Sequence, residues 1–210
     1  MTLMPLDALG VTSTDGVANL LATLLTVSTT PATLLLEELA CTQIRIEVLG
    51  RADRGLTAAE HYRLDAGPLT AGHYRTGLLR TASGLVAAET SLVILLERIS
   101  PHARAALAGT DTPVGKILAS LGVQRVDRRA LCRHGHLDTA GGDVAVESSA
   151  VLALDGIKVA IATERITGQF CQLIASNAPD TTSRMDSPVT AVEDLDVRTA
   201  LSGLARSQGS

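Results

Sequence analysis

The sequence predicts an α+β fold with an antiparallel sheet and flanking helices, and three observations support this prediction. Long runs that alternate apolar and polar residues occur in pairs joined by short turns, as in β-hairpins. The segments with helical periodicity are grouped, and they do not alternate one by one with the strands as in a parallel sheet. An Asp155-Gly156 step between the last two runs is a strong hairpin signal.

Two helices are predicted near the N-terminus. Thr14, Asp15 and Gly16 precede a run with apolar residues three to four positions apart, which indicates a helix over 16–27. A second helix over 31–39 follows, because Pro31 occupies a first helical position after hydroxyl residues that can cap it.

The middle of the chain alternates between strand and helix signals. A period of two predicts a strand over 43–49, and 51–72 is expected to be a loop with at most a short helical turn. The runs 73–82 and 85–96 form a predicted hairpin across Ala82-Ser83-Gly84. Each of the two helices that follow, 101–108 and 113–121, begins with a hydroxyl residue and a proline.

The last three predicted strands cover 123–133, 144–154 and 157–166. Beyond them the chain is rich in Pro, Ser, Asp and Thr with weak periodicity. We therefore predict a single domain over 1–177 and a loosely structured tail over 178–210.

Charge and aromatic content favour a small-molecule partner. The net charge of −4 and the pI of about 5.7 give no basic surface for a nucleic acid or an anionic membrane. Only Tyr62, Tyr74 and Phe170 carry aromatic rings, which are too few to stack a single strand of nucleic acid. The sequence leaves the oligomeric state open.

A cytoplasmic location is expected from the cysteines and the N-terminus. Cys41, Cys132 and Cys171 are an odd number without close spacing, as expected of reduced thiols. No basic region precedes an apolar stretch at the N-terminus, so a secretory signal is not expected. The apolar runs 17–27 and 33–39 are too short to cross a bilayer, which needs about 20 residues.

No metal or cofactor is expected. Cys132, His134 and His136 lie close together, but no second ligand pair is present, so exposed histidines in a turn are the favoured interpretation. Phosphate-binding and dinucleotide-binding glycine motifs are absent from the sequence. Arg128, Arg129 and Arg133 are interpreted as a solvated strand face.

Four segments in order carry a resemblance to a known family. They are 33–36 leading into the first strand, 73–79 followed by 86–90, the Thr112–Leu118 helix start, and Asp155-Gly156 followed by Ala162-Thr163-Glu164. Together they span about 30–167 and resemble the chorismate pyruvate-lyase family, especially its shorter actinobacterial 4-hydroxybenzoate synthases. This resemblance implies a sheet that encloses an internal ligand cavity.

The resemblance also implies an activity and a site. The reaction would be elimination of pyruvate from chorismate to leave 4-hydroxybenzoate, without a metal or an organic cofactor. Arg75 would bind the substrate carboxylate, and Glu164 would be the catalytic acid and base. Ala32 would lie at a lid loop, and the backbone of Val114 and Gly115 would contact the ligand.

The residues themselves are consistent with those roles. Arg75 shares a strand face with Gly77 and Leu79, so its guanidinium is expected to point inward and to need an anion. Glu164 follows the apolar run 159–162, and partial burial there would raise its pKa. In the alternative interpretation, Arg75 and Glu164 lie at strand ends in water or pair with each other.

Two departures from the family pattern keep other functions open. Ala32 stands where the family places a larger apolar residue, and the strand around 146–151 lacks the arginines that are usual there. Loss of basic residues would weaken recognition of a dianion. One alternative is a cyclase or isomerase with this fold, acting on an apolar intermediate in bacterial secondary metabolism. Another is a non-catalytic domain that binds a small ligand, as in the effector domains of some transcription regulators.

Overall fold

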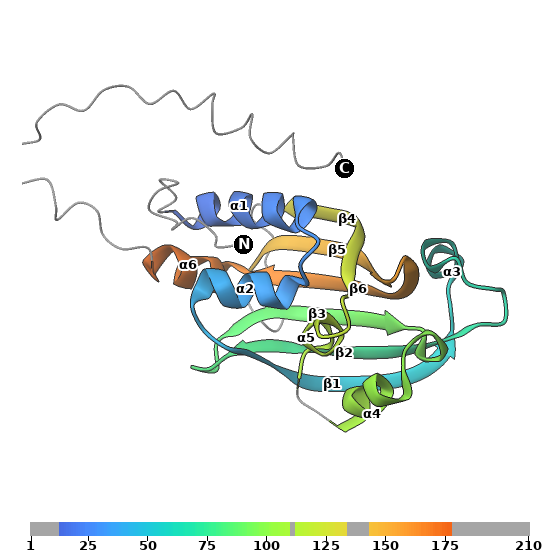
Figure 1. Cartoon of the computed structure of the whole chain (residues 1–210). Helices are drawn as coiled ribbons and strands as arrows, with labels where there is room; N and C mark the ends of the chain where they lie inside the picture. The colour runs from blue at the N-terminus through green and yellow to red at the C-terminus, as the bar shows by residue number, and fades with distance from the viewer. Residues whose placement is uncertain (1–12, 110–111, 134–142, 178–210) are drawn as a thin grey trace, which may run out of the picture. The chain divides into compact units, whose positions relative to one another are not determined.

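The computed structural model describes residues 13–109, 112–133 and 143–177, and it confirms the α+β fold with an antiparallel sheet (Figure 1). Six strands form one sheet in the order β1-β2-β3-β6-β5-β4, and every neighbouring pair is antiparallel. The strands are β1 (Ile44–Gly55), β2 (Ala71–Thr81), β3 (Val86–Ile94), β4 (Gln124–Cys132), β5 (Val144–Leu154) and β6 (Ile157–Thr167). The helices are α1 (Thr14–Val27), α2 (Ala32–Ala40), α3 (Ala58–Leu64), α4 (Pro101–Gly109), α5 (Val114–Ala119) and α6 (Gly168–Asn177), with a short 3-10 turn at Leu96–Arg98.

The β5–β6 hairpin forms at the predicted Asp155-Gly156 turn. Both residues have positive φ, 48° and 78°, which is the backbone that a two-residue hairpin of this kind requires. β6 also pairs with β3, with Thr90 opposite Glu164 and Leu92 opposite Ala162. This pairing joins the two halves of the sheet.

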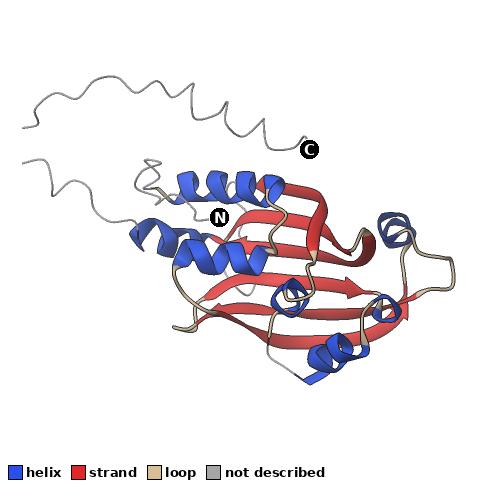
Figure 2. Ribbon diagram, in the orientation of Figure 1, coloured by secondary structure: helices blue, strands red, loops and turns tan. Residues whose placement is uncertain are grey.

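Helices cover one face of the sheet, and their contact with it forms the main core (Figure 2). α1, α2 and α6 lie on this face, and fully buried residues from each, such as Leu21, Leu36 and Phe170, pack on Ile44 and Ile166 of the strands. The Ser13 side chain caps α1 by accepting from the backbone N–H of Gly16 at 3.1 Å.

α3 covers part of the opposite face. Its Leu64 is fully buried with Val93 of β3 and Ile161 of β6. A reciprocal cap starts this helix, because Thr57 accepts from the backbone of Glu60 and the Glu60 carboxylate accepts from the backbone of Thr57.

Three boundaries differ from the sequence-based prediction. β1 continues to Gly55, because its backbone pairs with β2 as far as Gly55 opposite Ala71, and the side chains of this stretch point into water. α3 replaces most of an expected loop. α6 was not predicted, although its buried Phe170, Cys171 and Ile174 have helical spacing.

Some expectations fall outside the described residues. The tail over 178–210 lies there, as do His134 and His136. Within the described ranges, no helix is long and apolar enough to span a membrane.

Candidate ligand-binding site

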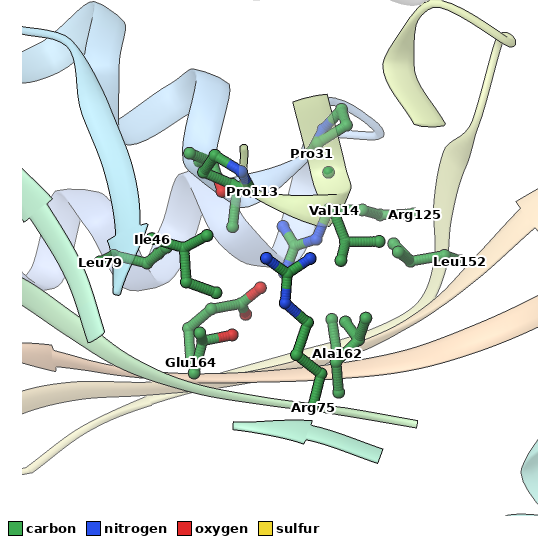
Figure 3. Close-up of a pocket in the computed structure, with 15 residues that line it drawn as sticks. Pro31, Ile46, Arg75, Leu79, Pro113, Val114, Arg125, Leu152, Ala162 and Glu164 are labelled. Carbon is green, nitrogen blue, oxygen red and sulfur yellow. The ribbon is translucent and has the colours of Figure 1, made fainter. Parts of the chain in front are cut away.

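A cavity lies between the helix-covered face of the sheet and the starts of α2 and α5 (Figure 3). All six strands and two helix starts contribute to its wall. Most of the lining is apolar, and three charged side chains face into it: Arg75, Arg125 and Glu164. The residues that line it are Pro31, Ala32, Thr33, Ile46, Arg75, Leu79, Thr90, Leu92, Pro113, Val114, Gly115, Arg125, Leu152, Ala162 and Glu164.

Strand alternation places Arg75 in this cavity. Arg75, Gly77 and Leu79 are the buried positions along the middle of β2, and Arg75 is only 1% exposed. Leu92 of β3 lies opposite Arg75, and Ala162 of β6 lies opposite Leu92. The arginine therefore shares one sheet face with apolar neighbours, as expected from the sequence.

Glu164 belongs to a buried polar chain that also includes Ser148 and Arg125. The Ser148 hydroxyl donates to Oε2 of Glu164 at 3.1 Å and accepts from Nη2 of Arg125 at 2.9 Å. Ser148 and Glu164 are directly opposite each other on β5 and β6. All three side chains are at most 6% exposed.

The burial of these groups changes their pKa values in opposite directions. Loss of hydration raises the pKa of Glu164 above its usual 4.5, and the charge of Arg125 and the Ser148 hydrogen bond oppose that rise. Loss of hydration likewise lowers the pKa of Arg125, and the charge of Glu164 opposes that fall. The arginine nevertheless stays protonated, because its unperturbed pKa is far above neutrality.

Arg125 also connects the cavity to α1. Its Nη1 donates to the backbone oxygen of Leu25 at 2.9 Å, and its backbone N–H donates to the oxygen of Thr29 at 2.9 Å. Its Nε is buried and has no hydrogen-bond partner among the described residues. Two of the three nitrogens of this guanidinium, Nη1 and Nη2, therefore donate to other protein groups, and Nε does not.

The starts of α2 and α5 close the cavity on the side away from the sheet. A Cβ added to Gly115 would lie 3.0 Å from Cβ of Pro31, so the two helix starts are in close contact. An ion pair of 2.7 Å between Nζ of Lys116 and Oε1 of Glu37 fastens α5 to α2. Glu37 also accepts from the backbone N–H of Ile44 at 2.6 Å, which links both helices to β1.

The cavity is tight in this structure. Its volume, counted as the space that the centre of a water molecule can occupy, is about 30 Å³. This volume leaves room for about two waters, since each needs about 10–15 Å³ by this measure. An organic ligand would therefore have to move side chains of the wall.

The structure brings together all five residues proposed from the sequence. Arg75, Glu164, Ala32, Val114 and Gly115 line the one cavity. Their binding roles remain a proposal, because their position alone does not test what they bind.

The sequence interpretation missed Arg125 and Ser148. The residues around 146–151 do lack arginine, and β4 supplies one to the same cavity instead. A signal was present, since Arg125 is in phase with the buried Val123, and Ser148 with Val146 and Ala150. Arg128 and Arg129, by contrast, lie at or near the surface.

Comparisons with known proteins find similarity in structure alone. No family model and no curated protein matches the sequence. The PhnF structure from Mycobacterium smegmatis has a TM-score of 0.49 at 9% identity, covering 63% of this chain and 62% of that chain. The chain thus spans about three fifths of PhnF.

Two further structures have similar values. The effector domain of the same PhnF has a TM-score of 0.49 at 10% identity, with 67% of this chain and 88% of that chain covered. A transcriptional regulator of the GntR family from Enterococcus faecalis V583 has a TM-score of 0.43 at 11% identity, with 59% and 94% covered. At such identities the likeness concerns the fold alone.

These findings correct the expectation of an enzyme. The solved structures similar to this chain are described as a transcriptional regulator and an effector domain, and no sequence match links the chain to chorismate pyruvate-lyases. They contradict the prediction of a cofactor-independent lyase, with a cyclase or isomerase as its alternative, whereas no comparison tests the role of Glu164. The alternative that they favour is a domain that binds a small ligand.

Proposed function

We propose that this chain is a small-molecule-binding domain whose ligand carries a carboxylate bound by Arg75. The observation that carries the proposal is the chemistry of the cavity wall. Two buried guanidinium groups, those of Arg75 and Arg125, face a cavity whose lining is otherwise mostly apolar. A guanidinium that faces a cavity of this kind favours an anion as the ligand.

A carboxylate fits this charge and the shape of a guanidinium. Arginine and carboxylate form paired, nearly parallel hydrogen bonds, which suit a planar anion in a narrow space. The apolar side chains around Arg75, such as Leu79, Leu92 and Ala162, would contact an aliphatic or aromatic body. The ligand we propose is therefore a small organic carboxylate.

Glu164 has a structural role in this proposal. Its carboxylate is held by the Ser148 hydroxyl and lies near the charge of Arg125. Through Ser148 it holds the guanidinium of Arg125 in position beside the cavity.

Calorimetric titration with pentanoate and with pentanamide tests the proposal. The two probes have the same carbon chain and differ in charge. Pentanoate should bind the wild-type protein, and the amide should bind far more weakly. Arg75→Met should weaken pentanoate binding by about 1.5–3 kcal/mol, about tenfold to hundredfold in Kd.

Arg80→Met is the matched control. Arg80 lies on the same strand, and its Nε donates to Glu47 at 2.5 Å at the protein surface. This variant should bind pentanoate as the wild type does. Equal binding of acid and amide, or full affinity in Arg75→Met, would contradict the proposal.

A further inference from the structure

Glu164 offers the cavity a hydrogen-bond acceptor in addition to the two guanidinium groups. Its side chain is 6% exposed, lines the cavity and points into it from β6 (Figure 3). Oε2 is bonded to Ser148, and Oε1 has no hydrogen-bond partner among the described residues. Oε1 is also not one of the side-chain atoms that are enclosed on all sides without a partner, so open space adjoins it. One oxygen of this buried carboxyl group is therefore left for a molecule in the cavity.

The Ser148 hydroxyl determines which oxygen of Glu164 is left. Nη2 of Arg125 donates to Oγ of Ser148 at 2.9 Å, and a guanidinium cannot accept a hydrogen bond. The single hydroxyl proton of Ser148 therefore points to Oε2 of Glu164, 3.1 Å away. These two bonds hold the carboxyl group in one orientation, in which Oε2 is occupied and Oε1 is available.

The size of the cavity makes this oxygen selective. The cavity has room for about two waters, and a water next to Oε1 can donate a hydrogen bond to it. An organic ligand that fills the cavity displaces such a water. A ligand that does not replace the lost hydrogen bond loses affinity, because a buried acceptor without a donor is costly. A donor on the ligand is therefore favoured over a carbon atom at this place.

This preference for a donor does not require a charge on Glu164. An ionised carboxyl group accepts through both oxygens, and a neutral one keeps acceptor capacity on the oxygen without the proton. Hydroxyl and amino groups can donate to Oε1, whereas an oxo group can only accept. A proton on Oε1 itself would reverse the preference toward an oxo group, which makes oxo acids the informative comparison.

We infer that Glu164 is a ligand-binding residue whose Oε1 accepts a hydrogen bond from the ligand, and that the cavity selects small carboxylates that carry a hydroxyl or amino group. This contact comes in addition to the bond between Oε2 and Ser148. The inference rests on the proposed function, because the ligand whose donor reaches Glu164 is the carboxylate that Arg75 binds.

Calorimetric titration of the wild-type protein with five-carbon acids tests the inference. The probes are pentanoate and its oxo, hydroxy and amino derivatives, each substituted at the α or the γ carbon. At one position or both, the hydroxy or the amino acid should bind about tenfold tighter than pentanoate and than the oxo acid substituted at the same carbon, the size of one hydrogen bond in a preorganised site. The hydroxy and amino probes tell a hydroxy acid from an amino acid as the class of ligand.

Glu164→Gln gives a readout that a purely structural role of Glu164 would not move. The amide oxygen should take the place of Oε2 as the acceptor for Ser148, which turns the amide NH₂ toward the cavity. Pentanoate binding should persist, the advantage of the amino acid should disappear, and the oxo acid should gain affinity relative to pentanoate. Glu89→Gln is the matched control, because Glu89 pairs with Arg165 at 3.3 Å and does not line the cavity. It should keep the wild-type preference.

Several results would overturn the inference. They are oxo acids that bind the wild type as tightly as the hydroxy and amino acids at both positions, pentanoate as the tightest probe, a preference that Glu164→Gln leaves unchanged, or an equal loss of all probes in that variant. Arg75-dependent binding of pentanoate to the wild type would then leave the proposed function standing. If Glu164→Gln does not fold, the comparison of probes on the wild type still decides. If none of the acids binds the wild type at millimolar concentration, the inference and the proposed function both fail.

Discussion

Ser148 joins Glu164 to Arg125: its hydroxyl donates to the Glu164 carboxylate at 3.1 Å and accepts from the Arg125 guanidinium at 2.9 Å. The three side chains are buried and come from three neighbouring strands, β6, β5 and β4. Because the hydroxyl serves both charged groups, it fixes their distance and orientation.

Ser148→Ala should therefore destabilise the protein by more than a usual surface change. The variant leaves a buried carboxylate and a buried guanidinium each without one partner, and such losses cost about 1–3 kcal/mol. Chemical denaturation measures the free energy of unfolding. Ser91→Ala is the matched control, because Ser91 is an exposed serine in a strand of the same sheet. Equal effects of the two changes would contradict this account of Ser148.

Glu164→Gln should change how stability depends on pH. The folded-state pKa of Glu164 is raised by burial above the usual 4.5, so its contribution to stability is fully present below about pH 4.5 and lost as the pH rises through the raised value. Glutamine does not titrate. The free energy of unfolding of the wild type should thus fall relative to that of Glu164→Gln as the pH rises from about 4.5 toward neutrality. Parallel curves for the two proteins would show that the pKa of Glu164 is not raised.

Gly115→Ala should strain the closed side of the cavity. The new Cβ would lie 3.0 Å from Cβ of Pro31, which belongs to a ring at the start of α2 and cannot move by itself. Overpacking of this kind costs about 1–3 kcal/mol. Gly55→Ala is the control, since a Cβ there has no neighbour within 4 Å. A melting temperature for Gly115→Ala that equals that of Gly55→Ala would mean that α5 shifts freely.

The cysteines should differ in reactivity toward iodoacetamide. Cys171 is fully buried, and burial raises its pKa to about 12, so very little thiolate exists at pH 8. Cys41 is exposed at the end of α2. Mass spectrometry of the native protein should find Cys41 modified and Cys171 protected, and denaturant should remove that protection. Rapid modification of native Cys171 would contradict its burial.

Much of the sheet could be predicted from side-chain periodicity. The alternation in 144–154 and 157–166 and the Asp155-Gly156 turn defined a hairpin correctly, because both depend on local residue types. The extension of β1 to Gly55 could not be found in this way. Its last residues are exposed on both faces, and they are held in the sheet by backbone pairing with β2 and by surface contacts such as the ion pair between Asp53 and His73.

The candidate site was predictable only in part. Arg75 and Glu164 were found because their segments resemble a family with an internal cavity, and alternation placed Arg75 inward. Arg125 was missed because β4 contains many charged residues and was taken for a solvated strand. A bulge at Asp127, with a positive φ of 43°, interrupts the alternation and sends the arginines on its two sides to different surroundings.

A crystal structure of the protein with pentanoate bound tests the central claim most directly. The account predicts the carboxylate within hydrogen-bonding distance of the Arg75 guanidinium, inside the cavity closed by Pro31 and Gly115, with the carbon chain against Leu79 and Leu92. Pentanoate bound anywhere else on the protein, or a carboxylate turned away from Arg75, would contradict it.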